Sequence, residues 1–156
     1  GGRVARQKQS LASVVEGRLR DIEKACALAL PTQIVRVSKM TRSVPVMDDE
    51  PNRVAVGRAM TLLHFSHEIR SSANYGGFSS TRTKVLEKLG EVLDKYLEET
   101  LDRIRAGEVD DHRALDFLGV VADFAVLARD DKAGEIVRRR AAAAVNAEKS
   151  PPAEVA

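Results

Sequence analysis

The stretch Thr81–Ala106, TRTKVLEKLGEVLDKYLEETLDRIRA, decides the expected fold. Its apolar residues recur at steps of three and four, the spacing of an amphipathic helix, at Val85, Leu86, Leu89, Val92, Leu93, Tyr96, Leu97, Leu101 and Ile104. At about 1.5 Å per residue, this helix is roughly 39 Å long, more than most globular helices. A rod with one apolar stripe is not stable alone, so it must pack against partner helices.

The segments on either side supply such partners. Residues 10–30 and 53–73 carry apolar residues at helical spacing before the rod. After it, residues 112–129 are apolar on nearly every side, so we expect this helix to be the most buried of the bundle. Residues 132–145 have high helix propensity and are expected to pack at the periphery.

The segment between the first two helices is less clear. Pro31 interrupts the helical pattern, and Thr32–Met40 is interpreted as a helix that restarts after it. The alternation of Ile34, Val35 and Val37 also fits an extended segment. Residues 41–52 hold two prolines and an acidic cluster, which are typical of a connector.

The sequence therefore predicts an all-α fold, an antiparallel bundle of four to six helices organised on the long helix at about 81–106. Residues 10–145 are expected to form a single domain. Residues 1–9 are expected to be a flexible lead-in, and residues 146–156, with Pro151-Pro152, a disordered tail.

Composition limits the function classes. Of 156 residues, 44% are hydrophobic and 31% charged, which suits a folded globule, and only 4% are aromatic, so the core must be aliphatic. A net charge of +2 does not indicate nucleic acid or an anionic membrane as partner. The single cysteine, Cys26, excludes an internal disulfide and predicts a cytoplasmic protein. No apolar run is long enough for a membrane span, although the chain opens Gly1-Gly2 without methionine and could be an excerpt of a larger, anchored protein.

One group of candidate metal ligands lies on the second helix. His64, His67 and Glu68 are spaced by three and four residues, and adjacent helical turns could hold a metal if another helix supplied further ligands. The sequence offers no second histidine pair and no cysteine partner. Ordinary boundary residues are the competing interpretation, and it is the favoured one.

The long helix also carries acidic residues at helical spacing, namely Glu87, Glu91, Asp94, Glu98 and Asp102. Facing a second acidic helix, they could coordinate a hard cation. Lysines and arginines are interleaved, so a solvated face with ion pairs within the helix is the better interpretation.

In the apolar helix, Asp116 and Asp123 lie seven residues apart on one face. Buried carboxylates need partners, but the pair can also mark an exposed edge of the helix. Phe117 is predicted to be an interface residue, together with the two aspartates, whereas Phe124 is predicted to belong to the core.

No catalytic set of nucleophile, base and acid can be assembled from spacing, so we expect no enzyme and no cofactor. Cys26 lies on an apolar stripe and is interpreted as a core residue rather than a nucleophile. The basic groups around Arg36 and at Arg138–Arg140 lack interleaved aromatic residues, which argues against nucleic-acid binding.

Two stretches carry a resemblance to a known family. LEKLGEVLDKYLEETLDRIRAGE (Leu86–Glu108) resembles the long helix followed by glycine in PhoU-like helical domains, and MTLLHFSHEIRSSANY (Met60–Tyr75) resembles a helix in the PhoU-like tails of sodium/phosphate cotransporters. The resemblance covers about a third of the chain. It implies three-helix units that regulate phosphate uptake or signalling, sometimes with metal clusters on Glu-xxx-Asp pairs. Glu98 and Asp102 have that spacing, but a matching motif on a second helix is missing.

Two classes of function follow. The first is a non-catalytic interaction or regulatory module that acts through helix faces, with a protein partner or a second copy of the chain. The alternative is a bundle that binds a metal or small ligand between helices.

Overall fold

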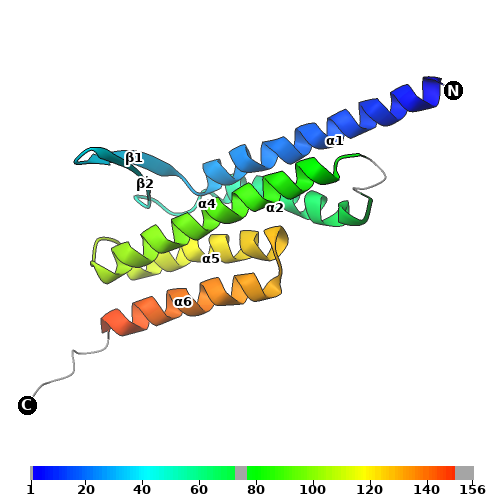
Figure 1. The fold of residues 1–156 in the computed structure, drawn as a ribbon. Helices are drawn as coiled ribbons and strands as arrows, with labels where there is room; N and C mark the ends of the chain where they lie inside the picture. Colours follow the sequence, from blue (N-terminus) through cyan, green and yellow to red (C-terminus); the bar gives the residue numbers. More distant parts are fainter. Residues whose placement is uncertain (1, 73–76, 150–156) are drawn as a thin grey trace, which may run out of the picture.

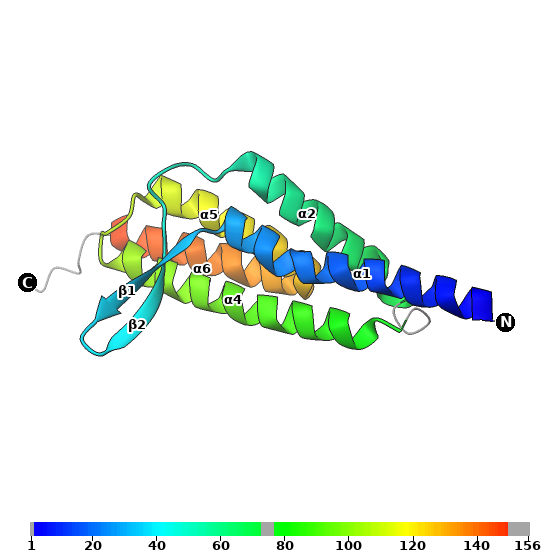
Figure 2. The same cartoon turned by 90° about the horizontal axis from the view of Figure 1, so that it is seen from above.

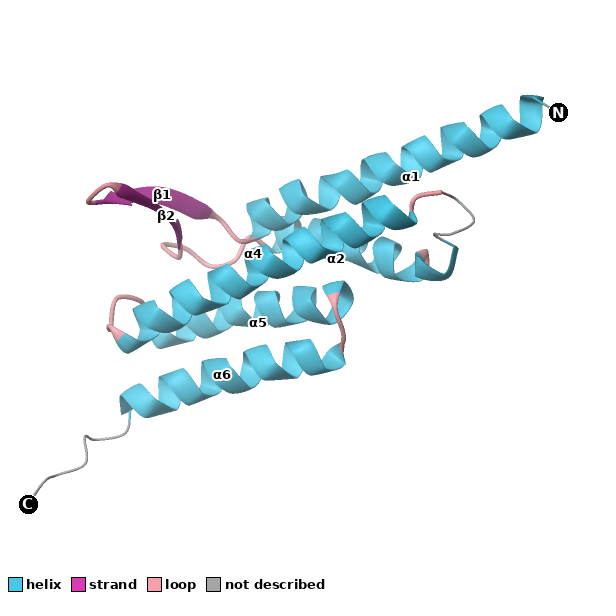
Figure 3. Cartoon of the chain, in the orientation of Figure 1, coloured by secondary structure: helices cyan, strands magenta, loops and turns pink. Residues whose placement is uncertain are grey.

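The computed structural model describes residues 2–72 and 77–149, with the side chains of residues 11–72 and 77–147. The described chain is mostly helical, with one small antiparallel sheet (Figure 3). Its elements are α1 (Gly2–Ala29), β1 (Thr32–Val37), β2 (Met40–Pro45), α2 (Arg53–Glu68), the 3-10 turn η1 (Arg70–Ser72), α4 (Ser79–Arg105), α5 (Asp111–Ala128) and α6 (Asp131–Lys149). Successive helices run in opposite directions (Figures 1 and 2), and α1 packs against both α2 and α4.

Helix α4 is the long rod that the sequence predicts. It contacts α1, α5 and α6 and also the strand β2, so it joins the helices to the sheet. Its C-terminus has a Schellman motif: Gly107, at φ 69°, donates its N–H to the Ile104 carbonyl, and Glu108 donates to Arg103. Its N-cap is Phe78, whose side chain makes no capping bond, so α4 is held by packing more than by its first turn.

Helix α5 is buried as predicted. Nine of its eighteen residues are buried, and it packs against α2, α4 and α6. Asp110 caps it, because its carboxylate accepts a hydrogen bond of 3.0 Å from the Arg113 N–H. Phe124 is a core residue, as expected, but Phe117 is only 2% exposed. The prediction that Phe117 is an interface residue is therefore wrong, since neighbouring helices cover that side of α5 as well.

The most extensive contact between two helices joins α5 to α6. Only two residues separate them, and Asp130 caps α6 by accepting a bond of 2.8 Å from the Ala133 N–H. A Cβ atom placed on Gly134 would lie 2.4 Å from Val126 Cγ2 and 3.0 Å from the Ala122 carbonyl oxygen. Glycine lets the two backbones approach at this point.

The all-α prediction is wrong at residues 32–45, which form a β-hairpin. Strands β1 and β2 pair in register from Thr32 opposite Pro45 to Val37 opposite Met40. The alternating β-branched residues favour strands, and Pro31 prevents α1 from continuing. The turn is Ser38-Lys39, with Ser38 at φ 59°, so it lacks the glycine or asparagine that would mark it in the sequence.

The ends of the domain also differ from the expectation. Helix α1 begins at Gly2, so the lead-in predicted for residues 1–9 is helical from Gly2 on. Helix α6 runs to Lys149, so residues 146–149 are helical rather than part of a tail; residues 150–156 lie outside the described residues. Asn52 caps α2, and its side-chain oxygen accepts bonds of 3.1 Å from the backbone N–H groups of Val54 and Ala55.

Gly134→Ala is expected to destabilise the fold by about 1–3 kcal/mol, although alanine is the better helix former by about 1 kcal/mol. The added methyl group meets the Val126 side chain first and then the Ala122 carbonyl oxygen, a backbone atom that cannot rotate away. Urea melts measure the change. Gly57→Ala is the matched control: a Cβ there meets nothing within 4 Å, so this variant should gain about 0.5–1 kcal/mol. Equal changes in the two variants would contradict the close contact.

Phe117→Ala and Phe124→Ala should each lower the free energy of unfolding by about 3–5 kcal/mol, because both rings are buried. Thermal or urea melts measure the loss. Leu115→Ala, on the same helix but 36% exposed, should cost much less. If Phe117→Ala left the free energy of unfolding nearly unchanged, this side of α5 would not be covered by neighbouring helices.

Candidate functional site

The predicted metal ligands do not assemble into a site. His64 and Glu68 are exposed on α2, and His67 is half-buried. Among the described residues, no three His, Cys, Asp or Glu side chains are grouped so that they could hold a metal ion. The missing element is a second helix with facing ligands, so the geometry does not support the metal prediction.

The two aspartates of α5 lie at its exposed edge rather than in the core. Asp123 accepts a bond of 2.7 Å from Arg138 of α6, and Asp116 lies 3.9 Å from the Nε2 atom of His112. Their side chains are 51% and 30% exposed. With Phe117 buried between them, the three residues do not form the docking surface that was predicted on α5.

The acidic face of α4 pairs mainly with another part of the chain. Arg129 binds Asp94 through two hydrogen bonds of 2.8 Å, and Arg140 of α6 binds Glu98. These contacts join α4 to the α5–α6 unit, whereas the sequence predicted pairs within α4, of which Asp102–Arg105 is one. Exposed pairs of this kind contribute about 0–1 kcal/mol each, so they orient α6 more than they stabilise it.

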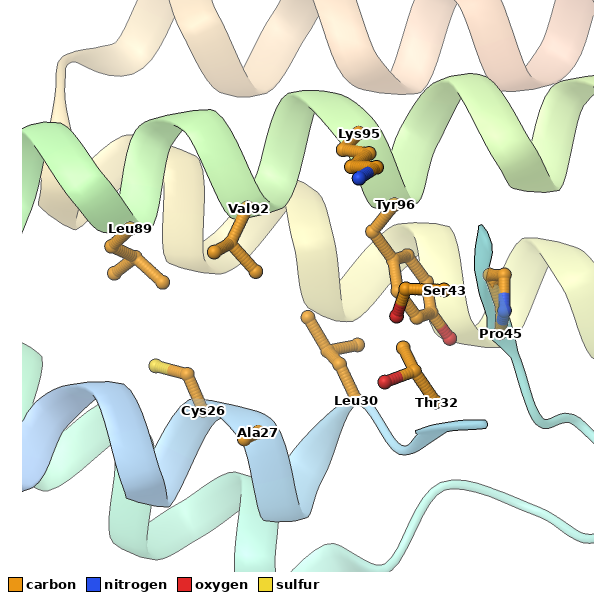
Figure 4. A pocket seen from close by; sticks show the side chains of 10 residues that line it. All are labelled: Cys26, Ala27, Leu30, Thr32, Ser43, Pro45, Leu89, Val92, Lys95 and Tyr96. Carbon is orange, nitrogen blue, oxygen red and sulfur yellow. The ribbon is translucent and has the colours of Figure 1, made fainter. Parts of the chain in front are cut away.

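A hollow that the sequence did not reveal lies between the end of α1, the hairpin and α4. We call it the notch; it has a volume of about 300 Å³. Leu89, Val92 and Cys26 lie toward one end, whereas Ser43, Thr32 and Tyr96 lie toward the other, with Lys95 above them (Figure 4). Its full lining is Cys26, Ala27, Leu30, Thr32, Ser43, Pro45, Leu89, Val92, Lys95 and Tyr96. The notch thus has an apolar end and a polar end.

Tyr96 is the unusual residue of the notch. It is only 4% exposed, and its hydroxyl is the one buried side-chain polar atom without a hydrogen-bond partner among the described residues. Burial raises the pKa of this hydroxyl, with a smaller opposing effect from Arg103. By contrast, the buried Thr100 hydroxyl is satisfied by the Tyr96 carbonyl at 2.8 Å. An unsatisfied buried hydroxyl costs about 1–3 kcal/mol, so Tyr96 needs an explanation.

Cys26, at the apolar end of the notch, is 2% exposed, as the core interpretation expects. Burial raises the pKa of its thiol to about 12. The thiolate is the nucleophilic form, so this thiol is unreactive at neutral pH. It lines the notch as a small apolar group.

The hairpin carries a second exposed surface, which we call the hairpin tip: Ile34, Arg36, Val37, Lys39 and Met40. Its three apolar side chains are 78%, 55% and 72% exposed, in chain order. Arg36 and Lys39 make no ion pair among the described residues, and residues 32–45 contain no acidic side chain. At the other end, Arg42 binds Glu99 and Arg103 donates to the Pro45 carbonyl, which fixes β2 on α4.

Searches of protein families, curated proteins and solved structures find nothing that matches this chain. The resemblance to PhoU-like domains therefore stays a prediction. None of the described helices is both long and apolar enough to cross a membrane.

The Cys26 thiol should be protected in the folded protein. At pH 8, a pKa of about 12 leaves roughly a thousandfold less thiolate than an ordinary cysteine has, so iodoacetamide should label it only as fast as the protein opens. Because the folded-state pKa is raised above the unfolded value, stability should fall as the pH rises from about 8.5 toward 12. The stability of Cys26→Ala, measured by urea melts, should fall less steeply with pH across this window. Fast labelling under native conditions would contradict the burial.

Proposed function

We propose that this chain is a non-catalytic interaction and regulatory module that binds an extended, acidic segment of another protein at the hairpin tip. The observation that carries the proposal is the hairpin, a two-stranded sheet that stands beside the helices (Figure 2). It exposes three apolar side chains, and two of its cations make no ion pair among the described residues. Val37 and Met40 pair across the two strands and share one face of the sheet, whereas Ile34 lies on the other face. Large apolar side chains exposed to this extent mark interaction sites.

The form of the partner follows from the two strands. Strand β2 lies against α4, whereas β1 is the outer strand and its other edge has no partner strand among the described residues. An isolated hairpin is marginally stable, and a third strand that pairs with the β1 edge adds main-chain hydrogen bonds and covers apolar area.

The charge of the partner follows from the cations. Arg36 lies on β1 and Lys39 in the turn, and neither pairs with a carboxylate in the part of the chain that the structure describes. Acidic side chains in the added strand would pair with them. A second copy of the hairpin is disfavoured, because its own three cations would face these two across the strands. The regulatory part of the proposal is supported by the PhoU-like resemblance.

Photo-crosslinking tests the proposal. A benzoylphenylalanine at Val37, in protein expressed in cells, should give a discrete adduct in which mass spectrometry locates an acidic, extended segment of one protein. The same probe at Val54, exposed on α2, is the control. The double variant Arg36→Glu with Lys39→Glu should abolish the adduct, because the new carboxylates repel an acidic segment. The same variant should also give no adduct when it is mixed with the purified partner.

Lys84→Glu with Lys132→Glu changes the net charge equally at exposed positions outside the hairpin, and should leave the adduct intact. Adducts to nucleic acid, to lipid, to a second copy of the chain, or to many proteins without an acidic segment would contradict the proposal.

A further inference from the structure

The notch has the composition of a small-molecule site rather than of a gap in packing. Its volume of about 300 Å³ is at the lower end of the roughly 300–1,000 Å³ of ligand pockets. Its walls come from α1, from the hairpin that follows it directly, and from α4, which lies much further along the chain. Such sites combine mostly apolar walls with a few polar groups, as the notch does.

The polar groups of the notch are gathered at one end. The hydroxyls of Thr32 and Ser43 and the ammonium group of Lys95 lie on the same side as Tyr96 (Figure 4). Lys95 is the one charged residue of the lining, and it makes no ion pair among the described residues, although Glu91 and Glu99 lie four residues away on α4. Glu99 is instead paired with Arg42 of the hairpin. The local charge at the polar end is therefore positive.

The Tyr96 hydroxyl is a second, independent indication. It is buried beside Thr32 and Pro45 at the polar end and lacks a partner among the described residues. Every other buried side-chain nitrogen or oxygen of the described chain has a hydrogen-bond partner, so the Tyr96 hydroxyl is an exception in this fold. A ligand that places a hydrogen-bond acceptor at this end would remove the free-energy cost of the unsatisfied hydroxyl.

We infer that the notch binds a small carboxylic acid with a short apolar body, such as a medium-chain fatty acid. The carboxylate lies at the polar end, where it pairs with Lys95, accepts hydrogen bonds from Ser43 and Thr32, and supplies the acceptor that Tyr96 lacks. The apolar body lies against Leu89, Val92 and Leu30. This site goes beyond the proposed function, because none of these residues belongs to the hairpin tip.

The limited volume favours a free small acid over the carboxyl terminus of a protein. The neutral alcohol of the same length separates the contribution of the carboxylate from that of the apolar body. Octanoate and octanol are therefore the probes, titrated into ¹⁵N-labelled protein and followed by amide chemical shifts. Octanoate should shift the amides of Leu30, Ser43, Val92 and Tyr96 in a saturable manner and bind more tightly than octanol.

Three variants complete the test. Lys95→Met keeps the aliphatic stem but removes the charge. It should weaken the binding of octanoate by about tenfold or more and leave the binding of octanol nearly unchanged. Lys84→Met, at an exposed position on the same helix, should change neither. Ala27→Phe, at an exposed helical position that lines the notch, should abolish binding of both probes without unfolding the protein.

Shifts that do not saturate or that lie outside the notch would overturn the inference. The inference would also be overturned if Lys95→Met lost as much affinity for octanol as for octanoate. Binding of an apolar peptide carboxyl terminus in place of octanoate would overturn it as well. The crosslinking result at Val37 does not depend on these outcomes, so failure of one proposal is distinguishable from failure of the other.

Discussion

Helix α5 has apolar side chains around most of its circumference, and no single neighbour can remove all of them from water. The rest of the arrangement meets this requirement. Helices α2, α4 and α6 each cover a different side, and α4 is long enough to carry α1 and the hairpin as well. Burial of the side chains of α5 outweighs the exposed ion pairs between α4 and the α5–α6 unit, because a buried phenylalanine contributes several kcal/mol and an exposed pair at most about one.

How much the sequence predicts depends on the length of each pattern. Helices α4 and α5 were predictable because their apolar spacing persists over several turns. For the hairpin, the alternation of Ile34, Val35 and Val37 left an extended segment open but did not decide it, because six-residue strands give few repeats and the turn at Ser38 carries no glycine or asparagine. The caps use residue types that favour these positions: Asp110 precedes α5, Gly107 follows α4 and Asn52 precedes α2.

The candidate site was less predictable than the fold. Tyr96 lies on the apolar stripe of α4, where an aromatic residue is interpreted as core, and only its hydroxyl gives a signal that a partner is needed. The notch itself arises from the meeting of three elements that no sequence period connects. Phe117 was assigned to the surface because a pattern on one helix does not specify how many neighbours cover it. His64, His67 and Glu68 show the converse: suitable spacing on one helix is insufficient without a facing element.

The two-residue link between α5 and α6 has a consequence for the order of folding. Closing so short a loop costs little chain entropy, and the contact at Gly134 is made between residues close in sequence. The contacts of the hairpin with α4 instead join residues such as Arg42 and Glu99, 57 positions apart. Topology therefore favours α5–α6 as the early unit and leaves the α1–hairpin–α4 side to assemble late. A chain that has formed its helical core would still lack the notch, so competence to bind there marks the end of folding.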